Sequence, residues 1–249
     1  MKGKVFLVGA GPGDPELLTR KGWRILQRAD VVLHDALVSD EVLACVSAHA
    51  RILHVGKRCG RKACTQQQIH AWMIAYAEAG LMVARLKGGD PLLFGRAGEE
   101  MDALRDAGIE FEVIPGVTAA FAAAAAAQVP LTERRRAAHL VFLTNHRYAN
   151  ATGDWSGLIS SDATTVIYMP GANYVDLAAR LTVAGLMPDT PIAIISAATT
   201  PLQQIHRTTL RDLGAATPLP APAVVIVGRA TAVHPQFSRE QIPLAVAAR

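Results

Sequence analysis

The chain has 249 residues, of which 51% are hydrophobic, 18% charged and 5% aromatic. This length accommodates one large or two medium domains with a sizeable core, and the composition excludes an intrinsically disordered protein. The formal charge of +4 admits either a nucleic acid or an acidic small molecule as a partner. The basic residues lie in short loop clusters and are not interleaved with aromatic residues, so we expect a polycarboxylate substrate and no nucleic acid. A solvated charged face is the alternative.

No segment indicates a secreted or membrane protein. The apolar stretch after Met1 is too short for a signal peptide, and the longest apolar region, residues 113–131, is mostly alanine and is interrupted by proline and glycine. The odd number of cysteines, three, favours a reducing compartment, so we expect a cytoplasmic protein without a membrane partner. Cys59 and Cys64 lack a second Cys or His pair at zinc-site spacing, so we expect no metal.

The first predicted element is a strand over residues 5–8, which runs into a glycine turn from Gly9 to Asp14. The turn looks at first like the start of a dinucleotide-binding fold. However, Asp14 stands where that motif has its third glycine, and Pro12 removes a backbone N–H that a pyrophosphate would use. Asp14 instead predicts the N-cap of a following helix, with Pro15 in its first position. The turn therefore suits a ligand without phosphates.

The rest of the first half alternates between helices and strands, which predicts a mostly parallel sheet. Further strands are expected at residues 31–34, 52–55, 81–86 and 111–114. The helix before the fourth strand has the capping pattern Thr65-x-x-Gln68 and ends at Gly80, and the next helix ends near Gly108.

A second glycine turn, Gly88-Gly89-Asp90-Pro91, follows the strand at residues 81–86. The two glycines permit a tight turn and a close approach of a ligand to the backbone. Pro91 keeps Asp90 out of the helical region, at the carboxyl end of the strand, where ligands bind in open α/β sheets. An ordinary surface turn is the better interpretation of this turn alone, but the first glycine turn shifts the balance towards a ligand site.

The second half has its own set of elements. Thr118 predicts the cap of a helix over residues 119–127, and another helix is expected over residues 175–184. Strands are expected at residues 140–144, 165–168, 192–196, 204–207 and 224–227. We therefore predict an α/β protein of two domains, each a mixed or mostly parallel sheet flanked by helices. The expected domains are residues 1–114 and 115–240, followed by a tail at 241–249.

Five motifs together resemble the tetrapyrrole methylase family. They are Gly9–Asp14, Val55-Gly56-Lys57-Arg58, Leu86–Pro91, Phe94-Gly95-Arg96 with Gly98-Glu99-Glu100, and Pro115-Gly116-Val117-Thr118. They stand in the family's order and spacing, and the resemblance runs from about residue 5 to residue 228. It implies that S-adenosylmethionine binds between two domains and that the chain is a homodimer. It further implies two methyl transfers to uroporphyrinogen III, through precorrin-1 to precorrin-2, with S-adenosylhomocysteine as the co-product.

The resemblance also implies roles for single residues. The implied cofactor contacts are Pro12, Gly88, Gly89, Asp90, Leu93, Thr118, Ala119, Met169 and Ala198. The implied catalytic residues are Asp35 as the base, Lys57 as the proton donor, and Arg96. The implied substrate contacts are Arg58, Glu99 and Arg134. Arginines suit this task because the planar guanidinium matches a carboxylate.

Several alternatives stay open. Leu93 and Met169 fit core packing, Asp35 and Lys57 fit substrate positioning alone, and Arg96 with Glu99, three residues apart at a helix start, fits a structural ion pair. The substrate could be a later corrin precursor such as precorrin-4. A protein of another class, a nucleotide or nucleic-acid binding module, could also use the glycine turns and basic loops.

Overall fold

The computed structural model describes residues 1–56, 64–134, 137–146 and 155–232. The first lobe contains β1 (Lys4–Gly9), η1 (Pro15–Leu17), α1 (Arg20–Leu26), β2 (Val31–His34), α2 (Asp40–Leu43), β3 (Arg51–His54), α3 (Gln66–Glu78), β4 (Val83–Lys87), α4 (Ala97–Asp106) and β5 (Glu110–Ile114). The second lobe contains α5 (Ala119–Ala126), β6 (His139–Thr144), β7 (Ala163–Tyr168), α6 (Tyr174–Val183), β8 (Pro191–Ser196), β9 (Gln204–Thr209), α7 (Leu210–Leu213), β10 (Ala223–Val227) and η2 (Arg229–Thr231). Each strand predicted from the sequence is confirmed, with ends that agree within two residues.

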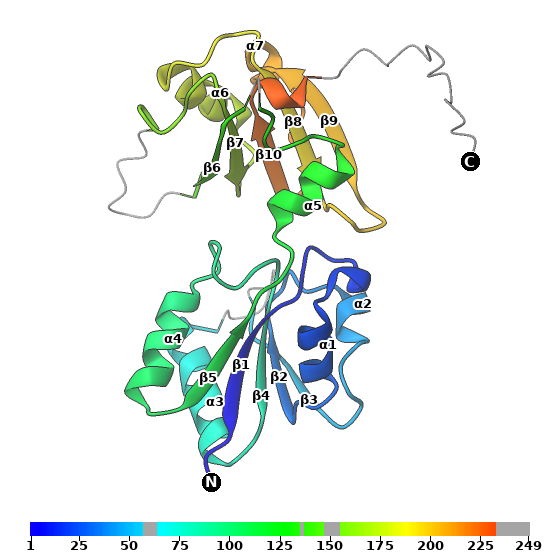
Figure 1. The fold of residues 1–249 in the computed structure, drawn as a ribbon, viewed down its shortest axis with the longest axis vertical. Coiled ribbons are helices and arrows are strands. Elements are labelled where there is room, and N and C mark those ends of the chain that lie inside the picture. Colours follow the sequence, from blue (N-terminus) through cyan, green and yellow to red (C-terminus); the bar gives the residue numbers. More distant parts are fainter. Residues whose placement is uncertain (57–63, 135–136, 147–154, 233–249) are drawn as a thin grey trace, which may run out of the picture.

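The two lobes lie one above the other, and the chain passes between them after β5 (Figure 1). The first sheet has the strand order β3-β2-β4-β1-β5, and all its pairings are parallel. The carboxyl ends of its strands therefore meet at one edge, and this edge faces the second lobe (Figure 1). Among the described residues, no helix is both long enough and apolar enough to cross a membrane.

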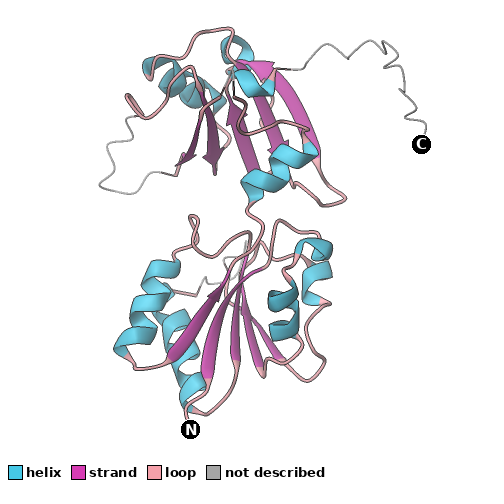
Figure 2. Cartoon of the chain, viewed as in Figure 1, coloured by secondary structure: helices cyan, strands magenta, loops and turns pink. Residues whose placement is uncertain are grey.

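Helices cover both faces of the first sheet (Figure 2). Successive side chains of a strand point to opposite faces. Thus Val5 and Leu7 pack in the cluster with α3 and α4, whereas Val8 packs in the cluster with α1 and α2. Both faces are buried, which explains why the central strands are mostly apolar in the sequence.

The second sheet is the mixed one. Its order is β6-β7-β10-β8-β9, and β6 pairs with β7 in parallel, whereas the other pairings are antiparallel. The helices α6 and α7 pack on one face, and α5 packs on the other. The alanines of α5, such as Ala120 and Ala123, are buried against Val166 and Ile226, because small side chains let the helix approach the sheet closely. The α/β fold class is thereby confirmed, with the parallel and the mixed sheet in separate lobes.

The proposed division into domains at residues 114 and 115 is supported by the chain path. Strand β5 ends at Ile114 in the first sheet, and α5 begins at Ala119 against the second sheet. We therefore keep 1–114 as the proposed first domain. The end of the proposed second domain and the predicted tail at 241–249 lie outside the described residues.

Two of the predicted helix caps form, at Thr65 and at Asp14, but Asp14 caps a different element from the one predicted. Thr65 and Gln68 form the reciprocal capping box of α3, with hydrogen bonds of 3.2 and 2.9 Å. Asp14 accepts a hydrogen bond from the Glu16 N–H at 2.8 Å, but it caps only η1, a 3₁₀-helix of three residues. The longer helix α1 has a separate N-cap, Thr19, so the helix predicted directly after Asp14 was placed too early.

Candidate active site between the lobes

The linker between the lobes, residues 115–118, passes the C-terminal end of β1. There its backbone packs directly against the backbone of Gly9 and Gly89. A Cβ on Gly116 would lie 2.3 Å from the Gly89 carbonyl oxygen and 2.8 Å from the Gly9 Cα, so only glycine fits there. Asp90 ties the same corner together: one carboxylate oxygen accepts the Gly116 N–H at 3.0 Å and the other accepts the Leu92 N–H at 2.9 Å. The structure therefore gives Asp90, a predicted cofactor contact, a role in shaping the turn.

The two glycine turns meet at this corner. Gly11 and Gly89 form an isolated antiparallel bridge, with N–H to carbonyl distances of 3.2 and 2.7 Å. Gly89 has φ of +66°, and a Cβ on it would point to the start of α5, 3.7 Å from the Ala119 nitrogen and 3.8 Å from the Thr118 Cα. The structure thus brings together three predicted cofactor contacts, Gly89, Thr118 and Ala119, and places the turn that contains Pro12 beside them.

Tyr168, the last residue of β7, joins α5 to the second sheet. Its hydroxyl lies 2.5 Å from the Thr118 Oγ1 and accepts the Ala120 N–H at 3.1 Å. Thr118 occupies the N-cap position of α5, but its hydroxyl contacts Tyr168 and makes no capping hydrogen bond. Burial raises the pKa of the Tyr168 hydroxyl, against the opposing effect of its hydrogen bond to Thr118. The ring centroids of Phe94, in the first lobe, and Tyr168 are 5.0 Å apart. The lobes therefore also make contact through side chains.

Two strained loops of the second lobe complete the arrangement. Met169 has φ of 49° and a side chain that is 43% exposed, so the core-packing alternative is wrong for this residue. Ala198 stands between Ala197 and Thr199, which have φ of 46° and 66°. The Thr199 Oγ1 accepts a hydrogen bond from the Asp14 N–H at 3.3 Å, which links this loop to the first glycine turn. Non-glycine residues with such backbone angles occur preferentially at functional sites.

A cluster of four charged side chains, which we call the charge cluster, lies at the carboxyl edge of the first sheet, the edge that faces the second lobe. It consists of Asp35, Arg85, Lys87 and Glu100. Arg85 donates to Asp35 at 2.5 Å and to Glu100 at 2.9 Å, and Lys87 donates to the other oxygen of Glu100 at 2.9 Å. Arg85 and Lys87 are two residues apart on β4 and therefore share the face that α4 covers. Asp35 is 29% exposed, against at most 3% for the other three, so it is the member that reaches solvent.

The two cations of the charge cluster respond differently to burial. Burial, and then the neighbouring charge of Arg85, lowers the pKa of the Lys87 ammonium, although Glu100 acts in the opposite direction. Burial also opposes the charge on Arg85, but Asp35 and Glu100 together raise the pKa of its guanidinium. The cluster pairs two cations with two carboxylates, so its formal charges cancel.

Arg96 and Glu99 form an ion pair at the start of α4. The Nε and Nη2 atoms of Arg96 donate to the two carboxylate oxygens of Glu99 at 2.8 and 2.7 Å. The hydrogen bond from Arg96 is the main cause that lowers the pKa of Glu99. Both side chains are about half exposed, at 52% and 51%. The ion pair that the sequence left open as an alternative therefore forms, but it is exposed to solvent and contributes little to stability.

The remaining predicted residues are placed less closely. Leu93 is half-buried, and a Cβ on Gly88 would lie 3.1 Å from the Leu37 Cβ. Arg134 is exposed. Lys57 and Arg58 lie outside the described residues.

Four residues of this arrangement were given no role in the sequence analysis. They are Arg85, Lys87, Glu100 and Tyr168. A signal for two of them was available: a central parallel strand is usually apolar throughout, and Arg85 and Lys87 interrupt β4 at alternating positions. Two cations on one buried face imply a buried carboxylate, which Glu100 supplies. Nothing in the local sequence distinguishes Tyr168 from any other tyrosine at the end of a strand.

The family model for tetrapyrrole (corrin/porphyrin) methylases matches residues 4–214. The chain belongs to this family. A uroporphyrinogen-III C-methyltransferase of Paracoccus denitrificans is 48% identical to this tetrapyrrole methylase over 236 residues, which cover 93% of the chain and 82% of the relative. A siroheme synthase of Actinobacillus succinogenes is 47% identical over 95% of the chain and 50% of the relative, so this methylase spans about half of that longer protein.

Solved structures of the family match this methylase over nearly its whole length. Uroporphyrin-III C-methyltransferase from Thermus thermophilus, complexed with S-adenyl homocysteine, has a TM-score of 0.80 and 36% identity, and the match covers 92% of this chain and 98% of that one. A cobalt precorrin-4 methyltransferase has a TM-score of 0.78 and 31% identity, with coverage of 92% and 96%. The resemblance and the two-lobed fold predicted from the motifs are confirmed.

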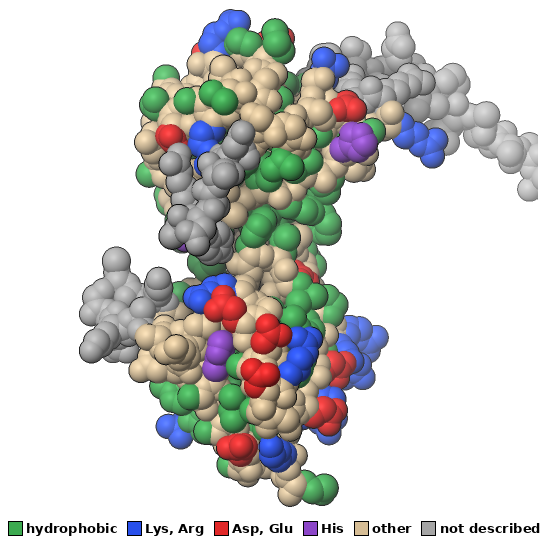
Figure 3. Space-filling view, turned by 90° about the vertical axis from the view of Figure 1, so that its left-hand side faces the viewer, with side chains coloured by type: hydrophobic (Ala, Val, Ile, Leu, Met, Phe, Trp, Pro, Cys, Tyr) green, Lys and Arg blue, Asp and Glu red, His purple; other side chains and the backbone are tan. Residues whose placement is uncertain are grey.

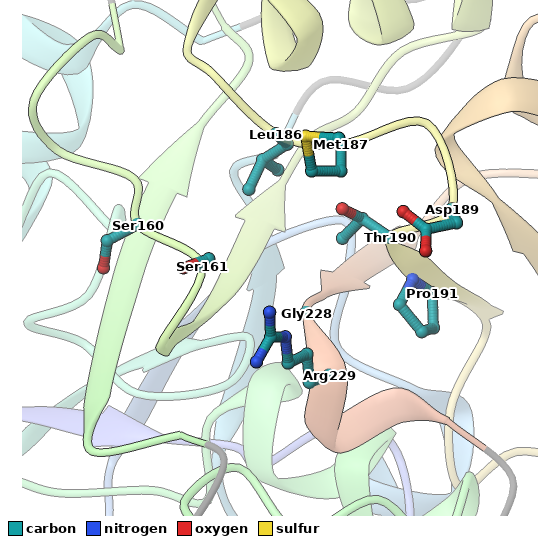
Figure 4. Close-up of a pocket in the computed structure, with 9 residues that line it drawn as sticks. All are labelled: Ser160, Ser161, Leu186, Met187, Asp189, Thr190, Pro191, Gly228 and Arg229. Carbon is teal, nitrogen blue, oxygen red and sulfur yellow. The ribbon is translucent and has the colours of Figure 1, made fainter.

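A cavity elsewhere in the tetrapyrrole methylase is not part of this site. It measures about 210 Å³ and is lined by Ser160, Ser161, Leu186, Met187, Asp189, Thr190, Pro191, Gly228 and Arg229 (Figure 4). Val224 of β10 pairs with Tyr168 near the linker, and Val227 continues away from it, so the cavity lies at the far end of the second lobe. On the face shown in Figure 3, the surface between the two lobes is mainly hydrophobic and uncharged.

Proposed function

We propose that this methylase transfers two methyl groups from S-adenosylmethionine to uroporphyrinogen III, by way of precorrin-1 to precorrin-2. The observation that carries the proposal is the 48% identity, over 93% of the chain, to a relative named for this reaction. The lower identity of 31% to cobalt precorrin-4 methyltransferase favours uroporphyrinogen III over a later corrin precursor.

We place S-adenosylmethionine at the junction of the glycine turns, the start of α5 and the two strained loops of the second lobe. The proposed contacts are Pro12, Gly88, Gly89, Asp90, Leu93, Thr118, Ala119, Met169 and Ala198. The residues fit the molecule, because Gly89 leaves backbone accessible beside α5 and Met169 presents an exposed thioether. When bound, the cofactor supplies an electrophilic methyl group on a cationic sulfonium. The nearby cation Lys87 is buried and paired with Glu100, so it does not compete with that charge.

The reaction requires an electron-rich carbon of the tetrapyrrole to attack the methyl group, and a proton to leave that tetrapyrrole afterwards. We propose that Asp35 accepts this proton, because its carboxylate is the part of the charge cluster that reaches solvent. Lys57 remains the proposed proton donor, and Arg58, Glu99 and Arg134 remain the proposed substrate contacts. Arg96 remains a proposed catalytic residue, and we propose that it acts by binding a carboxylate of the substrate. Holding the methyl group in line with the attacking carbon contributes to the rate enhancement, in addition to proton transfer.

Incubation with uroporphyrinogen III and S-adenosylmethionine labelled in its methyl group tests the function. Mass analysis should show a product that carries two labelled methyl groups, and an unmodified substrate would contradict the proposal. S-adenosylhomocysteine should raise the melting temperature, whereas ATP should not. Protection by ATP, or binding to nucleic acid that weakens steeply with salt, would support a nucleotide or nucleic-acid binding module instead.

Arg96→Lys should lower kcat/KM for uroporphyrinogen III by roughly 10-fold or more, although the charge is kept. Lysine cannot form the bidentate hydrogen bonds that arginine makes to a carboxylate. At least one charge-assisted hydrogen bond is therefore lost, and such a bond contributes about 1.5–3 kcal/mol. The exposed pair with Glu99 does not prevent this role, because such pairs contribute about 0–1 kcal/mol. Steady-state kinetics measure the loss, and S-adenosylhomocysteine affinity should stay near the parent value.

Arg105→Lys is the matched control for that variant. Arg105 forms the same kind of exposed ion pair, with Asp102 three residues before it, near the other end of α4. It should leave the kinetics unchanged. Parent-like kinetics in Arg96→Lys as well would remove Arg96 from the substrate site and leave only its pair with Glu99.

We also propose a homodimer. Strand β9 is an edge of the second sheet, Ile205 on it is 40% exposed, and Leu202 in the preceding turn is 76% exposed. Exposed apolar side chains beside an unpaired strand edge favour association. Light scattering at micromolar concentration should give about twice the mass of one 26.4 kDa chain, and a mass near one chain would overturn the dimer. The cytoplasmic location stays a prediction.

A further inference from the structure

We propose that Arg85 is a positioning residue for methyl transfer, and that it acts by holding one oxygen of Asp35 while Glu100 holds Arg85. This inference rests on the proposed function, and specifically on Asp35 as the base. It adds two buried residues that act through Asp35 and touch neither the cofactor nor the substrate.

The contacts of Arg85 leave its guanidinium no freedom to turn. Nη2 donates to the Asp35 Oδ1 at 2.5 Å and Nε donates to Glu100 at 2.9 Å. Nη1 lies 3.3 Å from both the Leu33 and Leu86 carbonyl oxygens. Its partners therefore come from β2, β4, α4 and the residue that follows β2. A planar guanidinium with contacts on all three nitrogens has one orientation.

Asp35 is held on β4 by its backbone as well as by its side chain. Its N–H donates to the Leu86 carbonyl at 3.1 Å, one residue along β4 from Arg85. The Oδ1 atom is taken by Arg85, and Oδ2 has no hydrogen-bond partner among the residues that the structure describes. The carboxylate thus has one oxygen held by Arg85 and one available for a proton, which is the arrangement that a base of fixed direction needs.

Stability alone gives little reason for such a cluster. Buried ion pairs are costly to desolvate, and replacing them by packed apolar residues is often neutral or stabilising. The charge cluster occupies two positions of the central strand of the first sheet, where valine or isoleucine would pack well. Its exposed end is a proposed catalytic residue. Orientation of Asp35 therefore accounts for the cluster better than stabilisation of the sheet does.

A double-mutant cycle tests the inference. We would measure kcat, S-adenosylhomocysteine affinity and the melting temperature for the parent, Asp35→Asn, Arg85→Lys and the double variant. If Arg85 acts through Asp35, Arg85→Lys lowers kcat by roughly 100-fold, as a small misplacement of a reacting group does. The double variant is then no slower than Asp35→Asn, within about threefold. Cofactor-product affinity stays within about twofold of the parent in every variant, since no member touches that site.

Lys87→Met is the matched control. Lys87 is equally buried and shares Glu100, but its ion pair is with Glu100, whereas Arg85 also pairs with Asp35. Its effect on kcat, whatever its size, should multiply with that of Asp35→Asn. If Arg85→Lys does not fold, Glu100→Asp replaces it in the same cycle, because it keeps every charge and displaces Arg85.

The outcomes separate the two claims. An active parent in which the Arg85→Lys and Asp35→Asn effects multiply overturns the positioning role and leaves the proposed function intact. A parent that does not methylate uroporphyrinogen III overturns the proposed function, and this inference with it. An active parent with a non-multiplying pair, beside a multiplying Lys87→Met control, supports the positioning role.

Discussion

Glu100→Gln should lower the free energy of unfolding by about 3–5 kcal/mol, because it breaks a buried ionic network from one side. Glu100 is fully buried and accepts hydrogen bonds from both Arg85 and Lys87, with a further one from Gln66 at 3.2 Å. The substitution leaves two buried cations with only the carboxylate of Asp35. Urea unfolding, which yields the free energy directly, measures the loss.

The neighbouring residue supplies the control for this experiment. Glu99→Gln makes the same chemical change one position earlier on α4, in a pair that is half exposed. It should change the free energy of unfolding by at most about 1 kcal/mol. Equal losses in the two variants, whether large or small, would contradict the buried network.

Most of the fold could be predicted because its determinants are local in the sequence. Alternating apolar strands and capped helices give the order of the elements, and the glycine turns give the edge of the sheet at which a ligand would bind. The capping box at Thr65 is fully specified by two residues, so it is present as predicted. Asp14 carries the same local signal, but a three-residue 3₁₀ turn satisfies it as well as a long helix does.

The site was predictable only in the parts that motifs encode. The glycines at positions 9, 89 and 116 are far apart in the sequence, and their mutual packing follows from the fold. The charge cluster required knowledge of which helix covers β4, because Glu100 looks like an ordinary helical glutamate beside Glu99. Local sequence does not distinguish the two residues, although one is buried and the other exposed.

Gly89→Ala should weaken S-adenosylmethionine and S-adenosylhomocysteine binding by roughly 10- to 100-fold, which corresponds to the 1–3 kcal/mol typical of an overpacked methyl group. The new Cβ would point to the space beside Thr118 and Ala119, where no described residue other than its chain neighbours has an atom closer than 3.7 Å. The clash would therefore be with the cofactor. Since Gly89 has φ of +66°, alanine also costs stability, by about 1–2 kcal/mol. Titration calorimetry with S-adenosylhomocysteine measures the affinity, and urea unfolding measures the stability.

Gly108→Ala separates the two effects. Gly108 has nearly the same backbone angle, φ of +60°, and among the described residues beyond its chain neighbours a Cβ there would meet only the Lys2 side chain, at 3.9 Å. It follows the C-terminal end of α4, at the amino end of β5. The backbone strain is therefore matched, but the site lies away from the proposed cofactor contacts. Both variants should lose similar stability, and only Gly89→Ala should lose affinity. Equal affinity in the two variants would move the cofactor away from the Gly89 turn, because a methyl group beside the start of α5 could not then be in contact with it.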